Sequence, residues 1–200
     1  TIIKAVANGR NVYRNIKNAI QFLLSGNMAG ILCVLYTSLL ALPLPFAPVH
    51  LLFINLITDS LPALALGVDK NDSKSLMRCP PRKASESLFA RGGIACTLFY
   101  GALITVIGLA AFLVLPCGIL AAEGELVGNP FTWVERLREL MSREQILAKS
   151  QTYAFTVLGM CQLYHAIGMR DVQKSVFAMS PRDNLLMVAA CIIGFILPFA

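Results

Sequence analysis

Long apolar stretches recur along the chain and are separated by shorter polar segments. The stretches cover about residues 19–42, 49–68, 93–122, 150–168 and 184–200. A helix needs about 20 predominantly apolar residues to cross the roughly 30 Å hydrocarbon core of a bilayer. The pattern therefore predicts an all-α fold, a polytopic transmembrane helix bundle of about five spans.

The polar segments divide the chain into four regions. Residues 1–18 are a polar lead that we interpret as a cytoplasmic stalk, and residues 19–68 are a two-helix hairpin whose turn is rich in proline. A charged, basic loop follows at 69–92, and residues 93–200 hold three supporting transmembrane helices with an outer loop at 123–149. The chain starts without Met and stops within an apolar stretch, so we expect it to be a fragment.

Composition excludes an ordinary soluble domain. Apolar residues make up 56% of the chain and charged residues 14%, whereas soluble domains average about 45–50% and about 25%. The net charge of +6 comes from 17 Lys and Arg against 11 Asp and Glu. Most of the Lys and Arg residues lie in segments 1–18, 69–92 and 169–183. If the chain crosses the membrane five times, these three segments lie on the same side. Because cytoplasmic loops are enriched in Lys and Arg, we expect a multi-pass integral membrane protein with a cytoplasmic amino end, which we assign to the plasma membrane. Membrane lipid is then a partner and nucleic acid is not.

A short amphipathic helix is predicted within the outer loop. Asn129 is a candidate N-cap, and Pro130 suits the first helical position. Trp133, Leu137 and Met141 then recur at helical spacing, opposite a charged face. We interpret this helix as a cap that lies on the outer surface and carries no chemistry.

The centre of the second span carries a charged side chain, Asp59. A carboxylate near the bilayer midplane costs at least about 2.5–3.5 kcal/mol, so a residue of this kind is by default functional. Asn55, Thr58 and Asp59 stand at i, i+3 and i+4 and are therefore expected to share one helical face. Pro62 lacks a backbone donor and clashes with the carbonyl of Thr58, which loosens the helix beside the carboxylate and frees main-chain oxygens.

These oxygen-bearing groups suit a hard cation. Ca²⁺ takes about six to eight oxygens from carboxylates, amides, hydroxyls and backbone carbonyls, and this face supplies part of such a set. In the first span, Asn27 lies within a G-x-x-x-G pattern formed by Gly26 and Gly30, which favours close helix packing and lets the Asn27 amide point at the same site. The alternative is a polar knot, in which Asp59 is protonated and bonded to Asn or Thr on a neighbouring helix.

Three segments of the chain resemble, in order and spacing, a known family. Residues 55–67, Asn-Leu-Ile-Thr-Asp-Ser-Leu-Pro-Ala-Leu-Ala-Leu-Gly, closely resemble the sixth transmembrane helix of P-type cation-transporting ATPases of the sarcoplasmic-reticulum calcium-pump class. Residues 9–17 resemble the stalk that leads into the fifth helix of these pumps, and residues 77–82 resemble the loop after the sixth. The resemblance implies that the chain is helices five to nine of such a pump.

The resemblance also implies a set of metal-binding residues. Asn55 and Asp59 correspond to the site that one-ion and two-ion calcium pumps share, while Thr58 and Asn27 lie toward the second site of the two-ion pumps. The set that we expect to contact the transported Ca²⁺ is therefore Asp59, Asn55, Asn27 and Thr58.

The second site of the family is expected to be lost in this chain. Two-ion pumps hold a Glu at two positions that align here with Gly30 and Gly159. Without these carboxylates, the resemblance implies one Ca²⁺ per cycle and a second cavity that is apolar and tightly packed. It also implies proton countertransport, because an emptied carboxylate in a low dielectric takes up a proton.

Several motifs are missing from the chain, and this limits what it does alone. It contains no D-K-T-G-T phosphorylation motif, no G-x-x-x-x-G-K-[ST] phosphate loop and no Ser/His/Asp arrangement. ATP and Mg²⁺ are then expected to bind only through domains missing from this chain, and its partners are the upstream helices and cytoplasmic domains of the same polypeptide. We expect His165 to be bonded within the helix bundle, with a proton-handling role as the alternative, and Gln162 to be a packing or hydrogen-bonding residue first and a ligand second.

Other functions stay open beside an ATP-driven, calcium-exporting pump. A secondary cation exchanger or channel module is typically built from inverted or duplicated repeats, and the chain shows no second copy of the Asn55–Pro62 pattern. A P-type pump for Mn²⁺ or Na⁺ is a second alternative, because Mn²⁺ also accepts oxygen ligands. A structural membrane subunit with Asp59 as an interhelical contact is a third.

Overall fold

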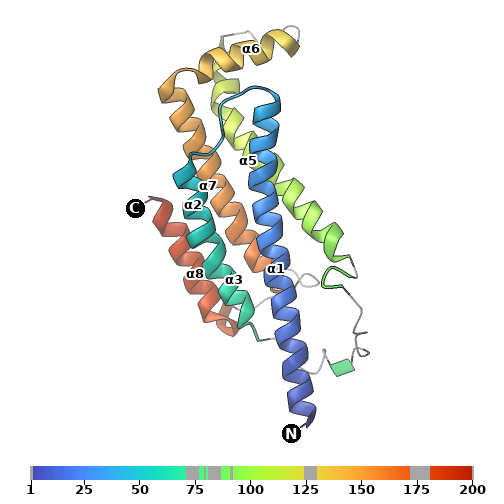
Figure 1. Ribbon diagram of the computed structural model, residues 1–200. Helices are drawn as coiled ribbons and strands as arrows, with labels where there is room; N and C mark the ends of the chain where they lie inside the picture. Colours follow the sequence, from blue (N-terminus) through green and yellow to red (C-terminus); the bar gives the residue numbers. More distant parts are fainter. Residues whose placement is uncertain are drawn as a thin grey trace.

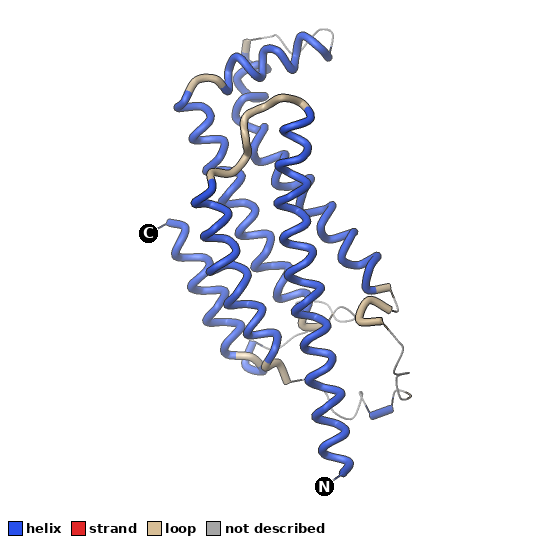
Figure 2. Tube along the Cα trace, in the orientation of Figure 1, coloured by secondary structure: helices blue, strands red, loops and turns tan. Residues whose placement is uncertain are grey.

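The computed structural model describes residues 2–70, 77–78, 80, 87–90, 92–123, 130–171 and 181–199. Over these residues the chain forms helices joined by loops and turns, without a strand (Figure 2). The predicted all-α fold is therefore confirmed for the described part of the chain. The predicted N-cap Asn129 and much of the predicted loop at 69–92 lie outside it.

The first helix, α1 (Ile2–Leu39), contains both the polar lead and the first apolar stretch. No proline interrupts residues 2–39, so the helix continues through the predicted boundary at residue 18. It ends at a turn in which Ala41 has a φ of 50°, just before the proline-rich connection. The amino-terminal end of α1 projects beyond the other helices (Figure 1), as expected of a stalk.

The second apolar stretch is one continuous helical rod with a change of winding in its centre. It consists of α2 (Pro48–Phe53), the π-helical segment η1 (Ile54–Asp59) and α3 (Ser60–Gly67). Pro48 occupies the first turn of α2, where its missing N–H is no loss. The widened turn of η1 lies just before Pro62, at the place where the sequence predicts a loosened helix.

The remaining helices follow the predicted order. They are α5 (Gly93–Ala122), α6 (Pro130–Met141), α7 (Glu144–Met169), the short η3 (Pro181–Asp183), α8 (Leu185–Ile196) and η4 (Leu197–Phe199). The bounds of α5 are those of the predicted third span. α6 lies across one end of the bundle (Figure 1) and matches the helix predicted in the outer loop.

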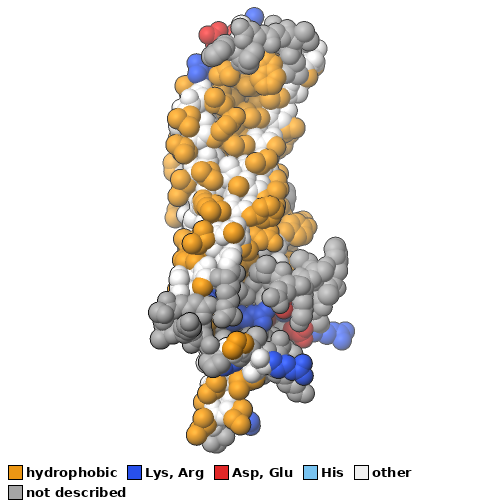
Figure 3. Space-filling model, turned by 90° about the vertical axis from the view of Figure 1, so that its right-hand side faces the viewer, with side chains coloured by type: hydrophobic (Ala, Val, Ile, Leu, Met, Phe, Trp, Pro, Cys, Tyr) orange, Lys and Arg blue, Asp and Glu red, His pale blue; other side chains and the backbone are white. Residues whose placement is uncertain are grey.

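On the face that Figure 3 shows, apolar side chains cover the middle of the bundle, whereas charged side chains lie near its ends. Within the described residues, three helical segments are long and apolar enough to cross a membrane: α1, residues 48–67 and α5. α7 is 26 residues long, but its first turns carry charged residues. α8 has 12 residues, fewer than the roughly 20 that a full span requires.

The helices bury two separate apolar clusters. The cluster nearer to α6 includes Ala29 of α1, Ile54 of η1 and Leu158 of α7. The other cluster includes Phe22, Ala65 and Ala166 of α1, α3 and α7. Between these two levels, the same helices bury polar side chains, among them Ser25, Thr58, Asp59, Gln162 and His165. A polar layer is therefore enclosed between two apolar cores.

Candidate cation site

Asp59 lies at the centre of the polar layer. Its side chain is 2% exposed, and within the described residues neither carboxylate oxygen has a hydrogen-bond partner. The hydroxyl of the neighbouring Thr58 is also buried and without a partner there. Unpartnered buried polar groups are rare and call for an explanation such as an ion, a water or a catalytic role. The predicted polar knot, in which Asp59 bonds to Asn or Thr, is not formed between the described residues.

The π-helical winding of η1 changes which residues face inward. Thr58 and Asp59 are buried, whereas Asn55 is exposed at the surface of the bundle. The prediction of one common face for these three residues assumed α-helical geometry, and a π-helix closes i→i+5 rings in place of i→i+4. Pro62 contributes to this winding, because it has no N–H to offer to the carbonyl of Thr58.

Gly26 of α1 makes room for two side chains from other helices. A Cβ atom added at Gly26 would lie 3.0 Å from Nε2 of Gln162 and 3.8 Å from Oδ1 of Asp59. The side chains of Gln162, on α7, and Asp59, at the end of η1, therefore meet at the same point of α1. Gln162 is 1% exposed, and its amide oxygen lacks a partner among the described residues. At Gly30, by contrast, the nearest atom to an added Cβ is Cδ2 of Leu51, at 3.9 Å.

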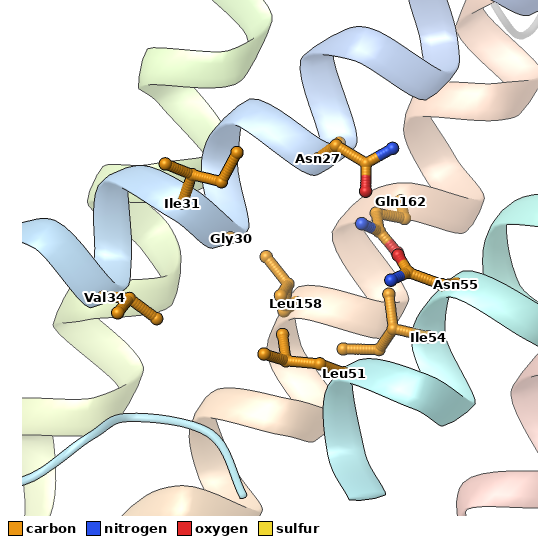
Figure 4. Close-up of a pocket in the computed structure, with 10 residues that line it drawn as sticks. Asn27, Gly30, Ile31, Val34, Leu51, Ile54, Asn55, Leu158 and Gln162 are labelled. Carbon is orange, nitrogen blue, oxygen red and sulfur yellow. The ribbon is translucent and has the colours of Figure 1, made fainter. Parts of the chain in front are cut away.

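A cavity of about 260 Å³ opens beside Gly26 and Gly30. Figure 4 shows the amides of Asn27, Asn55 and Gln162 converging on one side of this cavity, with apolar side chains such as Leu158 on the other. The Nδ2 group of Asn27 donates to the carbonyl of Leu23 at 2.9 Å, which leaves the amide oxygen for other contacts. The cavity is thus lined by three amides and by several apolar side chains, and the packing beside Gly30 is open.

The four predicted ligands thus fall into two groups. Thr58 and Asp59 are enclosed, while Asn27 and Asn55 line the cavity at the surface of the bundle. The two groups are connected by Gly26 and by Gln162, which the sequence predicts to be a packing or hydrogen-bonding residue first and a ligand second. The residue type of Gln162 does not by itself indicate that it is a ligand, because a polar residue in a long apolar helix is also compatible with a packing role. The position aligned with a Glu of two-ion pumps is Gly159, yet the side chain of α7 that lies with Asp59 against Gly26 belongs to Gln162.

His165 lies one turn of α7 beyond Gln162 and is bonded within the bundle, as predicted. Its Nε2 atom is 2.6 Å from the hydroxyl of Ser25, and its ring packs against Phe22 and Tyr100 at centroid distances of 5.7 and 4.5 Å. The Ser25 hydroxyl is also within hydrogen-bonding distance of two backbone carbonyls of α1, those of residues 21 and 22. This contact closes the polar layer on the side away from α6.

The chemistry of the polar layer suits a cation held by oxygen atoms. It presents one carboxylate, one hydroxyl and the amide oxygen of Gln162, all buried and unpartnered in the described part of the chain. Within that part, no group of three or more His, Cys, Asp or Glu comes together, so a soft-metal site of several thiolates or imidazoles is not formed there. Hard cations prefer carboxylate, amide, hydroxyl and carbonyl oxygens.

The apolar helices and their enclosed polar layer define a multi-pass integral membrane protein. The profile of the family described as cation transporting ATPase, C-terminus, matches residues 43–200. The chain therefore belongs to this family, the carboxyl-terminal membrane region of cation-transporting P-type ATPases, which confirms the predicted resemblance.

Three relatives cover nearly the whole chain. Calcium-transporting ATPase 1 of Bacillus cereus is 40% identical over 197 residues, which make up 98% of this chain and 21% of that protein. The calcium-transporting ATPase of Bacillus subtilis is 36% identical over 98% of this chain and 19% of its own length. Calcium-transporting ATPase 3, endoplasmic reticulum-type, of Arabidopsis thaliana is 31% identical over 98% of this chain and 20% of its own length. The chain spans about a fifth of these relatives.

Proposed function

We propose that this chain supplies part of a mid-membrane Ca²⁺ site in an ATP-driven, calcium-exporting pump. The observation that carries the proposal is the buried carboxylate of Asp59, which has no partner among the described residues. Burying an unpaired charge costs several kcal/mol, and a cation that binds there offsets this cost. The names of the relatives, which are calcium-transporting ATPases, favour Ca²⁺ as the transported ion.

Asp59, Thr58, Asn27 and Asn55 are the proposed ligands, with Gln162 as an additional oxygen donor. Asp59 is the one carboxylate of this group, so a second negative charge must come from another part of the pump to balance one Ca²⁺. Two bound Ca²⁺ would require more carboxylates than this layer offers. We therefore propose one ion per cycle, exchanged for protons that neutralise the emptied carboxylates.

The exposed amides of Asn27 and Asn55 support the prediction that upstream helices of the same polypeptide complete the site. Both amides lie at the level of the polar layer, on the surface of the bundle. A polar side chain at membrane depth is costly unless it faces protein or water.

ATP hydrolysis and Mg²⁺ binding belong, in this proposal, to cytoplasmic domains outside residues 1–200. We also propose that the chain crosses the membrane five times, that its amino end is cytoplasmic and that the pump lies in the plasma membrane.

The decisive experiment uses the full-length pump that contains this chain. Asp59→Asn should abolish Ca²⁺-dependent phosphorylation by ATP, because it removes the charged ligand and keeps the shape of the side chain. Asn55→Ala should weaken the Ca²⁺ dependence less, since it removes one neutral ligand at the surface of the bundle. Unchanged Ca²⁺ affinity in Asp59→Asn would refute the assignment.

Two alternatives are tested by the same preparation. A pump for Mn²⁺ would show phosphorylation that depends on Mn²⁺ at lower concentration than on Ca²⁺. A secondary exchanger or channel module would transport the ion in vesicles without ATP. The proposed pump requires ATP for transport and prefers Ca²⁺.

A further inference from the structure

A buried ion pair ties the end of α3 to two other helices. Asp69, two residues beyond α3, accepts hydrogen bonds from Nε and an Nη atom of Arg170 at 2.9 and 3.2 Å. Asp69 is 5% and Arg170 8% exposed. The amide of Asn184, which caps the first turn of α8, donates to the same carboxylate at 3.1 Å and to the carbonyl of Ala65 at 2.8 Å.

The stalk helix joins the same cluster through its own amide side chains. Nδ2 of Asn15 lies 2.8 Å from the carbonyl of Asp69 and 3.1 Å from that of Gly67. Asn18 donates to the carbonyl of Arg170 at 3.3 Å. α1, α3, α7 and α8 are therefore joined at one point, which we name the register clasp (Asn15, Asp69, Arg170 and Asn184).

The cation site and the register clasp lie on the same three helices. From Asp59 to Asp69 the chain advances ten residues, and from Gln162 to Arg170 eight. On α1 the distance from Gly26 back to Asn15 is eleven residues. At a rise of about 1.5 Å per residue, these separations are about 15, 12 and 17 Å. The three helices thus contact each other at two levels, which lie within about one helical turn of the same spacing on each helix.

We propose that the register clasp is a positioning device that fixes the height of Asp59 relative to Gln162 and Gly26, an inference that rests on the proposed function. Apolar contacts between helices are non-directional, so they constrain the axial position of a helix less sharply than a hydrogen-bonded ion pair does. The bidentate Arg170–Asp69 contact does not allow it, since a guanidinium and a carboxylate bond in one planar arrangement. Sliding of α3 by one residue would break the clasp and also move Asp59 away from Gln162.

The test replaces the ion pair by apolar residues in the full-length pump. Asp69→Leu with Arg170→Met leaves no unpaired buried charge, and replacements of this kind are often neutral for stability. We expect thermal stability close to that of the unchanged pump but an apparent Ca²⁺ affinity lowered by about tenfold, within the range of coupling between separate sites. Asp69→Asn with Arg170→Gln retains a hydrogen-bonding pair and should recover part of this loss.

A matched control uses a second ion pair at the same end of the bundle. Arg14 and Asp171 are 3.0 Å apart and join α1 to the residue after Arg170. Arg14→Gln with Asp171→Asn should leave the Ca²⁺ affinity unchanged, because this ion pair does not include α3.

Two results distinguish the failure of each proposal. Wild-type Ca²⁺ affinity in both double variants of the register clasp, with Asp59→Asn inactive, would show that the clasp only stabilises the fold. Wild-type affinity in Asp59→Asn would overturn the cation site itself, and the positioning role with it.

Discussion

A single methyl group added at Gly26 tests the geometry of the cation site. In Gly26→Ala the new Cβ lies 3.0 Å from Nε2 of Gln162 and 3.8 Å from Oδ1 of Asp59. A contact of 3.0 Å is too close, so the buried amide of Gln162 must shift by a few tenths of an ångström. Overfilling a packed site costs about 1–3 kcal/mol. This cost disturbs the arrangement of Gln162 and Asp59 at the proposed site. A loss of about 1.4 kcal/mol in the free energy of ion binding lowers the Ca²⁺ affinity about tenfold.

Gly30→Ala is the matched control for this variant. It adds the same methyl group one turn further along the same helix, where the nearest atom would be Cδ2 of Leu51 at 3.9 Å. The gain in helix propensity, about 1 kcal/mol in soluble helices, is common to both variants and cancels in the comparison.

The assay is the Ca²⁺ dependence of phosphoenzyme formation from ATP by the full-length pump. We expect a curve shifted to about tenfold higher Ca²⁺ for Gly26→Ala and an unshifted curve for Gly30→Ala. Equal Ca²⁺ affinity for the two variants would refute the reasoning, because it would mean that Gln162 and Asp59 do not meet at Gly26 in the functional pump.

Two further changes test other parts of the structure. Gly30→Glu together with Gln162→Glu places two carboxylates at the 260 Å³ cavity and should raise the number of bound Ca²⁺ per phosphorylation site from the proposed one to two, measured by equilibrium binding of radioactive calcium. An unchanged number would contradict the proposal that too few carboxylates limit the site to one ion. Arg138→Ala removes two hydrogen bonds, of 3.1 and 2.6 Å, to the carbonyl of Leu40. It should destabilise the α6 end of the bundle by about 1 kcal/mol, seen as a lower midpoint of thermal inactivation. Arg136→Ala, which breaks an exposed ion pair within α6, should leave that midpoint unchanged.

The length and order of the helices could be predicted from the sequence because apolar runs set them directly. α5 begins at Gly93 and ends at Ala122, as the third run predicts, since charged residues flank that run on both sides. The start of α6 can also be predicted from the sequence, because Pro130 suits a first helical turn. The boundary at residue 18 between the polar lead and the first span does not appear as a helix end. Helix formation in α1 does not depend on whether a residue lies in lipid or in water, so the helix continues through this boundary.

The details of the cation site depend on geometry that the sequence does not encode locally. The effect of Pro62 was predicted as a loosened helix, but whether it produces a kink or a π-helical segment depends on the packing of η1 against α7 and α3. The π-helical winding of η1 leaves Asn55 facing the cavity and encloses Thr58 and Asp59. Residue spacing alone assigns all three residues to one face, because it assumes an α-helix.

Gln162 illustrates a second limit. Whether a polar residue on α7 contacts Asp59 is determined by the rotation of α7 about its axis, which is set by contacts with α1 and α5. One of these contacts is made at Gly26, where the absence of a side chain lets Gln162 approach. The G-x-x-x-G pattern correctly predicted close packing there, but Gly30, the second glycine of the pattern, is not in a tight contact.

The location of the polar layer between two apolar clusters has a consequence for ion binding. Apolar clusters lie on both sides of the layer, and the carboxylate of Asp59 is 2% exposed, without a hydrogen-bond partner among the described residues. Its charge must be balanced by a cation, by a proton or by a group from another helix. The exposed amides of Asn27 and Asn55 lie on the side from which such a helix would approach. In the proposed pump, ion binding and assembly of the upstream helices on this face are therefore expected to be coupled, because both would stabilise a carboxylate that has no partner among the described residues.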